Sequence, residues 1–143
     1  MTTISISTEV RDTLASNGAV VALESTIFSN LGLPSPANAQ ALSSCIAAIR
    51  KAGAVPAITA VIDGVARVGL NESEHERILG PAKKAGEREL ALAIAQQWNV
   101  GATTVSASLL LAARAGIGVF ATGGIGGVHR DVQLHGDISI TVL

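Results

Sequence analysis

Apolar runs alternate with amphipathic stretches along the chain, and this alternation predicts its elements. The continuous apolar run Ala19–Leu23 and the largely apolar run Val55–Ile62 have the length and composition of buried strands. Residues Ala37–Lys51 instead repeat apolar side chains at helical spacing. Further helices are expected at Ser7–Ser16, Glu72–Leu79, Glu87–Gln97 and Ser106–Ala115, and further strands at Val65–Gly69, Thr103–Val105 and Ile117–Ala121.

Cap and turn residues mark the ends of several of these elements. Ser7 and Asn71 each precede a predicted helix and are expected to cap it. Asp63-Gly64 stands between two apolar runs, which is the strongest short hairpin signal in the chain. These residues therefore support the element boundaries that the apolar pattern predicts.

Strands that alternate with helices, several of them continuously apolar, indicate an α/β fold. We expect a single layered α/β/α domain over residues 1–143, with a largely parallel or mixed central sheet. The chain has 143 residues, of which 48% are hydrophobic, and this is enough for one core. The last residues, Asp137–Leu143, form an apolar segment without a polar tail or helix cap, so we expect a truncated domain.

Charge, aromatic content and cysteine content narrow the class of protein. The net charge is −1 and only 2% of the residues are aromatic, so no nucleic-acid partner is expected, because such surfaces need cations and stacking platforms. No apolar segment has the length of a membrane span, and the first residues lack the layout of a signal peptide. The single cysteine, Cys45, agrees with a reducing compartment. We predict a soluble cytoplasmic protein with no membrane partner.

A glycine-rich segment, Thr122–Gly127 (TGGIGG), directly follows the last apolar run. Glycines such as Gly123 and Gly124 allow backbone N–H groups to approach an anion closely. Glycines after a strand also form plain tight turns, and the spacing differs from the dinucleotide and P-loop fingerprints. An anion-binding loop and an ordinary turn both account for the segment.

Glu24 is a carboxylate placed directly after the buried run Ala19–Leu23. Burial would raise the pKa of this carboxyl towards the range useful for a general acid. A hydrogen-bonded loop entrance explains the same residue, because Ser25 and Thr26 follow it. Lys83 and Lys84 have a similar pair of explanations, since lysines before a helix either favour an anion there or are simply solvated.

Several candidate residues follow predicted strands. Parallel sheets bind ligands at the carboxyl ends of their strands. Glu24, the pair Thr104 and Val105, and the glycine loop with Gly123 and Gly124 all occupy such positions. We therefore expect them to share one pocket for a small molecule, with phosphate donors and a metal-binding carboxylate in the segment that follows the loop.

Four motifs in this order carry a family resemblance: VALEST (Val21–Thr26), GAVPA (Gly53–Ala57), GATTV (Gly101–Val105) and VFATGGIGGVHR (Val119–Arg130). Together they resemble the pseudouridine-5′-phosphate glycosidase family, also called the indigoidine synthase A-like family, from about Val20 to Ser139. Members of that family are roughly twice as long as this chain, so the resemblance covers their N-terminal half. The resemblance implies reversible cleavage of the carbon–carbon glycosidic bond of pseudouridine 5′-phosphate to uracil and ribose 5-phosphate. This is hydrolase or lyase chemistry of nucleotide metabolism.

The resemblance also implies roles for individual residues. Glu24 matches the proton donor, and Asp137 matches the ligand of a divalent metal, usually Mn²⁺. The positions that match substrate contacts, with His129 as a phosphate contact, are Lys84, Val105, His129 and Ser139. A sugar phosphate or nucleoside phosphate is the implied ligand, and a homotrimer is the implied assembly.

Departures from the family pattern predict weak or lost activity. The family's nucleophilic lysine belongs to a segment after Ser139 and has no counterpart here, so covalent catalysis should be missing. Ile140-Thr141 replaces an alanine–aspartate pair, Ser29–Pro34 replaces a histidine-containing segment, and the segment around Lys84 has lost positive charge. Two other possibilities remain open: a non-catalytic phosphate-binding or assembly module, and one half of a split enzyme completed by a second chain.

Overall fold

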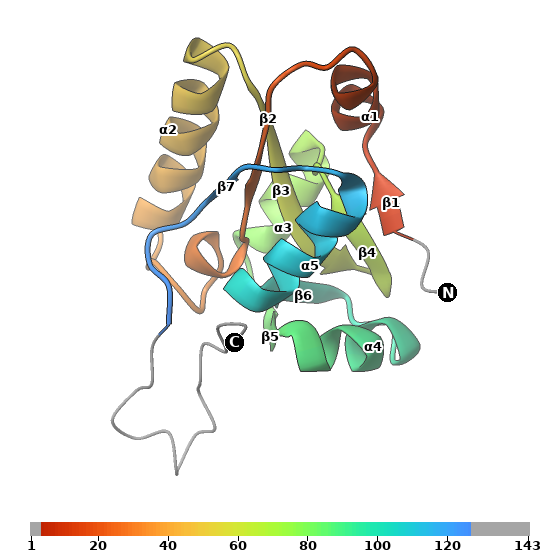
Figure 1. Cartoon of the computed structure of the whole chain (residues 1–143). Coiled ribbons are helices and arrows are strands. Elements are labelled where there is room, and N and C mark those ends of the chain that lie inside the picture. Colours follow the sequence, from red (N-terminus) through yellow and green to blue (C-terminus); the bar gives the residue numbers. More distant parts are fainter. Residues whose placement is uncertain (1–3, 127–143) are drawn as a thin grey trace.

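The computed structural model describes residues 4–126, which form one mixed sheet with helices on both faces (Figure 1). The strands are β1 (Ile4–Ile6), β2 (Val20–Leu23), β3 (Val55–Ile62), β4 (Val65–Val68), β5 (Lys83–Ala85), β6 (Val100–Thr103) and β7 (Phe120–Ala121). The helices are α1 (Thr8–Ala15), α2 (Ala37–Lys51), α3 (Glu72–Ile78), α4 (Glu87–Ala95) and α5 (Val105–Ala115), and a short 3-10 helix, η1, spans Thr26–Phe28.

Two hydrophobic clusters lie on opposite faces of the sheet. The first contains side chains from α1, α4 and α5, such as Val10 and Leu111. The second contains side chains from η1, α2 and α3, such as Phe28, Leu42 and Ile78. This three-layer arrangement confirms the expected α/β fold. No helix of the described residues is long and apolar enough to cross a membrane.

Strand β3 is buried on both faces, as its predominantly apolar sequence predicts. Ala57 and Val61 belong to the first cluster, while Ile58 and Ile62 belong to the second. Successive side chains of a strand point to opposite faces, so a continuous apolar run is needed wherever both faces are covered.

One edge of β3 is shared by two strands that run in opposite directions. Strand β2 is parallel to β3, and its last residue, Leu23, pairs with Ile58. Strand β6 is antiparallel to β3, and Ala102 pairs with Ala60. The carboxyl ends of β2 and β6 therefore meet opposite Thr59. The other edge of β3 pairs with β4.

The structure confirms the caps and the hairpin. Ser7 Oγ accepts a hydrogen bond from the N–H of Val10, and Asn71 forms a capping box with Glu74. Asp63 and Gly64 have φ angles of 49° and 73°, the left-handed conformation that a two-residue hairpin turn of this kind requires. Helix α2 and strand β3 have the predicted bounds.

The predicted strand Thr103–Val105 is wrong in its placement. The strand is β6, which ends at Thr103, and Val105 is the first residue of α5. The sequence pattern of β6 was weak because the strand contains Gly101. A Cβ on Gly101 would lie 3.1 Å from Cβ of Val61 on β3, so close packing between the strands favours glycine at this position. The three-residue strands β1 and β5 were not predicted, and the expected strand Ile117–Ala121 is shorter in the structure.

Candidate functional site

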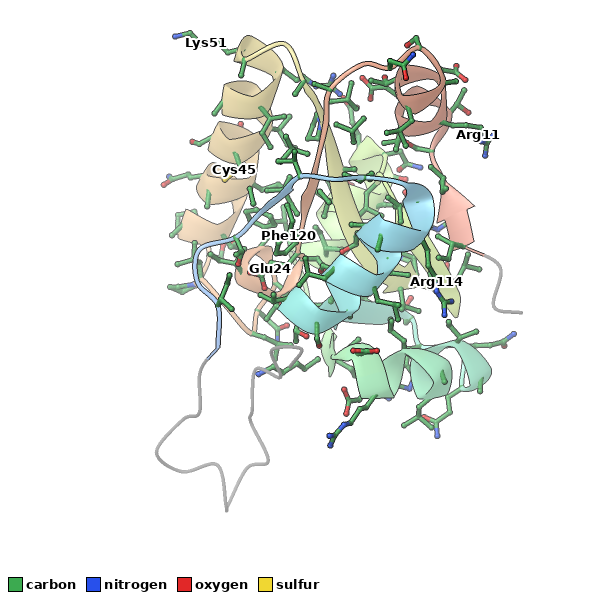
Figure 2. The ribbon with its side chains drawn as sticks, in the orientation of Figure 1. Arg11, Glu24, Cys45, Lys51, Arg114 and Phe120 are labelled. Atoms are coloured by element: carbon green, nitrogen blue, oxygen red, sulfur yellow. The ribbon has the colours of Figure 1, made fainter. Side chains whose placement is uncertain are left out.

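The carboxyl ends of four strands converge beside Glu24. Strands β2 and β7 are parallel, with Leu23 paired to Ala121. Strands β5 and β6 are parallel, with Ala85 paired to Thr103. Because β2 and β6 also meet end to end along β3, the residues that follow all four strands gather at one place. Figure 2 shows Glu24 at the end of β2, the strand that pairs with β7.

Glu24 is hydrogen-bonded to the first residue of the glycine loop. Thr122 Oγ1 donates to Glu24 Oε1 at 2.5 Å, across a sequence separation of 98 residues. The N–H of Gly124 donates to the same Thr122 oxygen at 3.3 Å. The hydroxyl of Thr122 therefore fixes both the carboxyl group and the backbone of the loop.

Burial raises the pKa of Glu24 above its usual range, which is the direction that its position after a buried strand predicts. The hydrogen bond from Thr122 and the positive charge of Lys84 act in the opposite direction and offset part of this effect. A carboxyl group with a raised pKa keeps its proton at higher pH and is suited to act as a general acid.

A cavity of about 230 Å³ lies next to this carboxyl group. Its walls come from β2, η1, α2 and β7, and the residues that line it are Leu23, Glu24, Ile27, Phe28, Ala41, Cys45, Ala121, Thr122 and Gly123. The lining is apolar except for Glu24, Thr122 and the thiol of Cys45. The carboxyl group thus faces a poorly solvated space, which explains the direction of its pKa.

The two adjacent lysines have different surroundings. Lys83 Nζ lies 4.9 Å from the centroid of the Trp98 ring. Lys84, the next residue of β5, instead acts on Glu24 through its charge. Successive side chains of a strand point to opposite faces, so only one lysine of such a pair can face the site. The structure places Lys84, and not Lys83, on the side of Glu24.

Thr104 and Val105 lie at the site, but their side chains are buried. Thr104 is the N-cap residue of α5, its Oγ1 is 3.3 Å from Oγ of Ser106, and it is 2% exposed. Val105 is 5% exposed. The first N–H groups of a helix have no acceptor within the helix. Any contact of these two residues with a ligand therefore uses the backbone.

The glycines of the loop have two different surroundings among the described residues. A Cβ on Gly123 would lie 3.0 Å from Cδ1 of Ile27, so close packing against η1 explains this glycine. A Cβ on Gly124 would meet nothing within 4 Å. Packing thus accounts for Gly123 alone, and an anion-binding role for the loop stays a prediction.

The remaining predicted site residues, His129, Asp137 and Ser139, lie outside the described residues. Within residues 4–126, no group of three or more His, Cys, Asp or Glu side chains could hold a metal ion. The Mn²⁺ site therefore stays a prediction.

The hydrogen bonds of Ser25 to Thr103 agree with the expected hydrogen-bonded loop entrance after Glu24. The sequence analysis did not predict that Ser25 forms a cluster of four buried hydroxyl groups with Thr59, Thr103 and Ser108, which we call the hydroxyl cluster. All four residues are 0% exposed. The signal in the sequence is a hydroxyl residue inside an otherwise apolar run, as Thr59 is in VPAITAVI.

Comparison with known proteins identifies the family. The model of the family described as "Indigoidine synthase A like protein" matches residues 9–142. The chain belongs to the indigoidine synthase A-like family. The resemblance carried by the VALEST, GATTV and TGGIGG motifs is thereby confirmed.

Curated members of the indigoidine synthase A-like family are much longer than this chain. The chain is 56% identical over 128 residues to the pseudouridine-5′-phosphate glycosidase of Streptomyces griseus, covering 88% of this chain and 39% of that protein. It is 50% identical over 140 residues to the pseudouridine-5′-phosphate glycosidase of Escherichia coli, covering 95% and 44%. The chain thus spans less than half the length of these relatives.

Two solved structures share the fold of this chain. One is the prealnumycin C-glycosynthase AlnA in complex with ribulose 5-phosphate, with a TM-score of 0.77 and 38% identity over 95% of this chain and 44% of that chain. The other is an indigoidine synthase A-like protein from Thermotoga maritima, with a TM-score of 0.75 and 32% identity over 90% and 41%.

Proposed function

We propose that this chain supplies the general acid, Glu24, of an active site that cleaves the carbon–carbon glycosidic bond of pseudouridine 5′-phosphate. The observation that carries the proposal is the hydrogen-bonded, half-buried Glu24 carboxyl at the meeting point of four strand ends. The names of its relatives support the choice of reaction.

The proposed reaction needs a positioned acid. When the bond between the ribose and the uracil ring breaks, the leaving carbon must receive a proton. Glu24 would deliver it and become a carboxylate, which the Thr122 hydroxyl and the charge of Lys84 would stabilise. The oxygen of one water molecule forms the new bond to the ribose carbon, and the net reaction consumes that water. In the reverse direction the carboxylate would take a proton from the same carbon, as reversibility requires.

The proposed ligand is a sugar phosphate or nucleoside phosphate. A solved relative that is 38% identical binds ribulose 5-phosphate, and this supports a phosphorylated sugar for the present chain. Lys84 would supply charge, and the backbone N–H of Val105, at the start of α5, would supply a donor. His129 and Ser139 complete the proposed set of contacts.

We also propose that Asp137 binds Mn²⁺, a cation that oxygen ligands suit. When bound, such a cation would polarise oxygen atoms of the substrate. We expect titration of the chain with Mn²⁺, followed by electron paramagnetic resonance, to show loss of the free-ion signal. Asp137→Asn should abolish this loss, while Asp131→Asn should retain it, and equal binding by both variants would contradict the assignment.

The proposed site needs residues from the part of the relatives that this chain does not cover. The matched relatives contain more than half of their length beyond the region that this chain covers. Val119 and Ile125, beside β7, are 57% and 70% exposed, and apolar side chains of this kind favour association. We propose that activity requires a part equivalent to that remainder, whereas a trimer formed by residues 1–143 alone, without activity, would favour an assembly module.

Uracil release from pseudouridine 5′-phosphate with Mn²⁺ tests the proposed function. The assay compares this chain alone with this chain plus the remaining C-terminal part of the Escherichia coli relative, supplied separately. We expect release in the mixture, and a fall of about 10²- to 10⁴-fold for Glu24→Gln, because a positioned general acid contributes that much. Glu76→Gln, on the exposed side of α3, is the matched control. Equal rates for Glu24→Gln and the control would contradict the role of Glu24.

A further inference from the structure

The backbone of β3 changes partner at Thr59. Ile58 is the last residue of β3 paired with β2, and Ala60 is the first residue paired with β6. The regular ladder between strands is interrupted at this point, although the surrounding backbone is buried. Buried N–H and C=O groups need partners, so the interruption has to be filled by other polar groups.

Side-chain hydroxyls of the hydroxyl cluster fill the interruption. Thr103 Oγ1 donates to the carbonyl oxygen of Thr59 at 2.6 Å. Thr59 Oγ1 lies 3.2 Å from the carbonyl oxygen of Leu23, at the end of β2. Ser25 Oγ accepts from the N–H of Thr103 at 2.8 Å. Each of these bonds joins two different strands or their ends.

The same cluster reaches the helix that follows β6. Thr59 Oγ1 lies 2.8 Å from both Thr103 Oγ1 and Ser108 Oγ, and Ser108 belongs to α5. The backbone of Leu23 directly precedes Glu24, and Thr103 directly precedes Thr104. The cluster thus connects the segment that carries Glu24 to the segment that carries Thr104 and Val105.

Packing alone does not explain these residues. Valine has the shape of threonine and would fill the same space without a buried hydroxyl, whose desolvation costs free energy. A fully satisfied buried polar network instead fixes one relative arrangement of its parts. Here the fixed parts are the two strand ends at which the proposed acid and the proposed backbone donors lie.

We propose that Thr59 and Thr103 are positioning residues, whose hydroxyls hold the carboxyl end of β2, and with it Glu24, against the carboxyl end of β6. The inference rests on the proposed role of Glu24. Its test needs no turnover, so failure of the positioning role and failure of the proposed reaction can be told apart.

The test is a carbon-detected NMR titration of the Glu24 carboxyl group in the whole chain, without substrate. Thr59→Val removes the hydroxyl and keeps the shape, so Glu24 should become better solvated and its pKa should fall by about 0.5 or more. Thr59→Ser keeps the hydroxyl and should preserve the wild-type pKa. Val10→Ala, at a buried core residue of α1, is the control for lost stability and should also preserve the wild-type pKa.

Each outcome decides the proposal. A lowered pKa in Thr59→Val, with Thr59→Ser and Val10→Ala like the wild type, supports it. An unchanged pKa in a folded Thr59→Val protein overturns it, and so does an equal fall in Val10→Ala. If Thr59→Val does not fold, Ser25→Ala removes the acceptor of the Thr103 N–H and is judged by the same titration.

Discussion

Glu24 is partly buried and Glu74 is buried, and different groups contact their two carboxyl groups. Glu74 is 7% exposed, lies 2.9 Å from Nε of Arg67, and accepts a hydrogen bond from the N–H of Asn71. Glu24 accepts a hydrogen bond from the hydroxyl of Thr122 and borders an apolar cavity. A carboxylate with a cation and a backbone donor stabilises the fold, whereas a poorly solvated one is suited to exchange a proton.

Loss of the Glu74 side chain should give the largest change in stability. Glu74→Ala removes the partner of Arg67 and the acceptor of the Asn71 N–H, so the free energy of unfolding should fall by about 2 kcal/mol, less than for a fully buried pair because Arg67 is partly exposed. Urea unfolding at neutral pH measures this change. Glu72→Ala, exposed in the first turn of the same helix, should cost about 0.5 kcal/mol or less. Equal losses of stability in Glu74→Ala and Glu72→Ala would contradict the stabilising role of Glu74.

Glu24→Gln should affect stability in the opposite direction, and the effect should depend on pH. The folded protein raises the pKa of Glu24, so the favourable contribution of this residue is full below its unfolded pKa and is lost as pH rises through its folded pKa. The glutamine variant lacks this loss and should gain stability relative to the wild type as pH rises. Urea unfolding between about pH 4 and pH 8 follows the difference.

Glu9→Gln is the control, because its effect on stability should change with pH in the opposite direction to that of Glu24→Gln. The Arg50 guanidinium, 2.7 Å away, lowers the pKa of Glu9, so its contribution is present above the unfolded pKa and lost as pH falls. The wild type should therefore gain stability over Glu9→Gln as pH rises, by a small amount because the pair is exposed. A common trend for both variants would show that Glu24 is not held as described.

The two adjacent lysines provide the smallest expected effect. Lys84→Met removes the charge that opposes the effect of burial, so the pKa of Glu24 should rise further. Lys83→Met removes only the contact with the Trp98 ring and should leave that pKa unchanged. The NMR titration of Glu24 compares the two variants. A larger rise in Lys83→Met would contradict the placement of these side chains.

The sequence predicts those parts of this fold that depend on neighbouring residues. Helix α2 and strand β3 follow from the period of their apolar residues, and the Ser7 and Asn71 caps follow from local hydrogen bonding. Strands β1 and β5 have three residues each, which is too short for a period to appear. Their positions are set by pairing with β4 and β6, which no local pattern records.

The candidate site, like the fold, has features that the local sequence predicts and features that depend on the order of strands in the sheet. Burial after a strand predicted the direction of the pKa of Glu24, because the strand itself was visible in the sequence. The partner Thr122, the separation of Lys83 from Lys84, and the hydroxyl cluster could not be predicted. All three depend on the order of strands in the sheet, and in particular on β2 and β6 sharing one edge of β3.

That shared edge also sets the time at which the site can form. The contacts of Glu24 with Thr122 and of Ser25 with Thr103 join residues 98 and 78 positions apart. A ribosome must release Thr103 and Thr122 before these contacts can form, and contacts between distant residues form slowly. The elements on β3 can assemble earlier through the local hairpin with β4. We therefore expect the acid to reach its final environment among the last steps of folding, after the sheet that supports it.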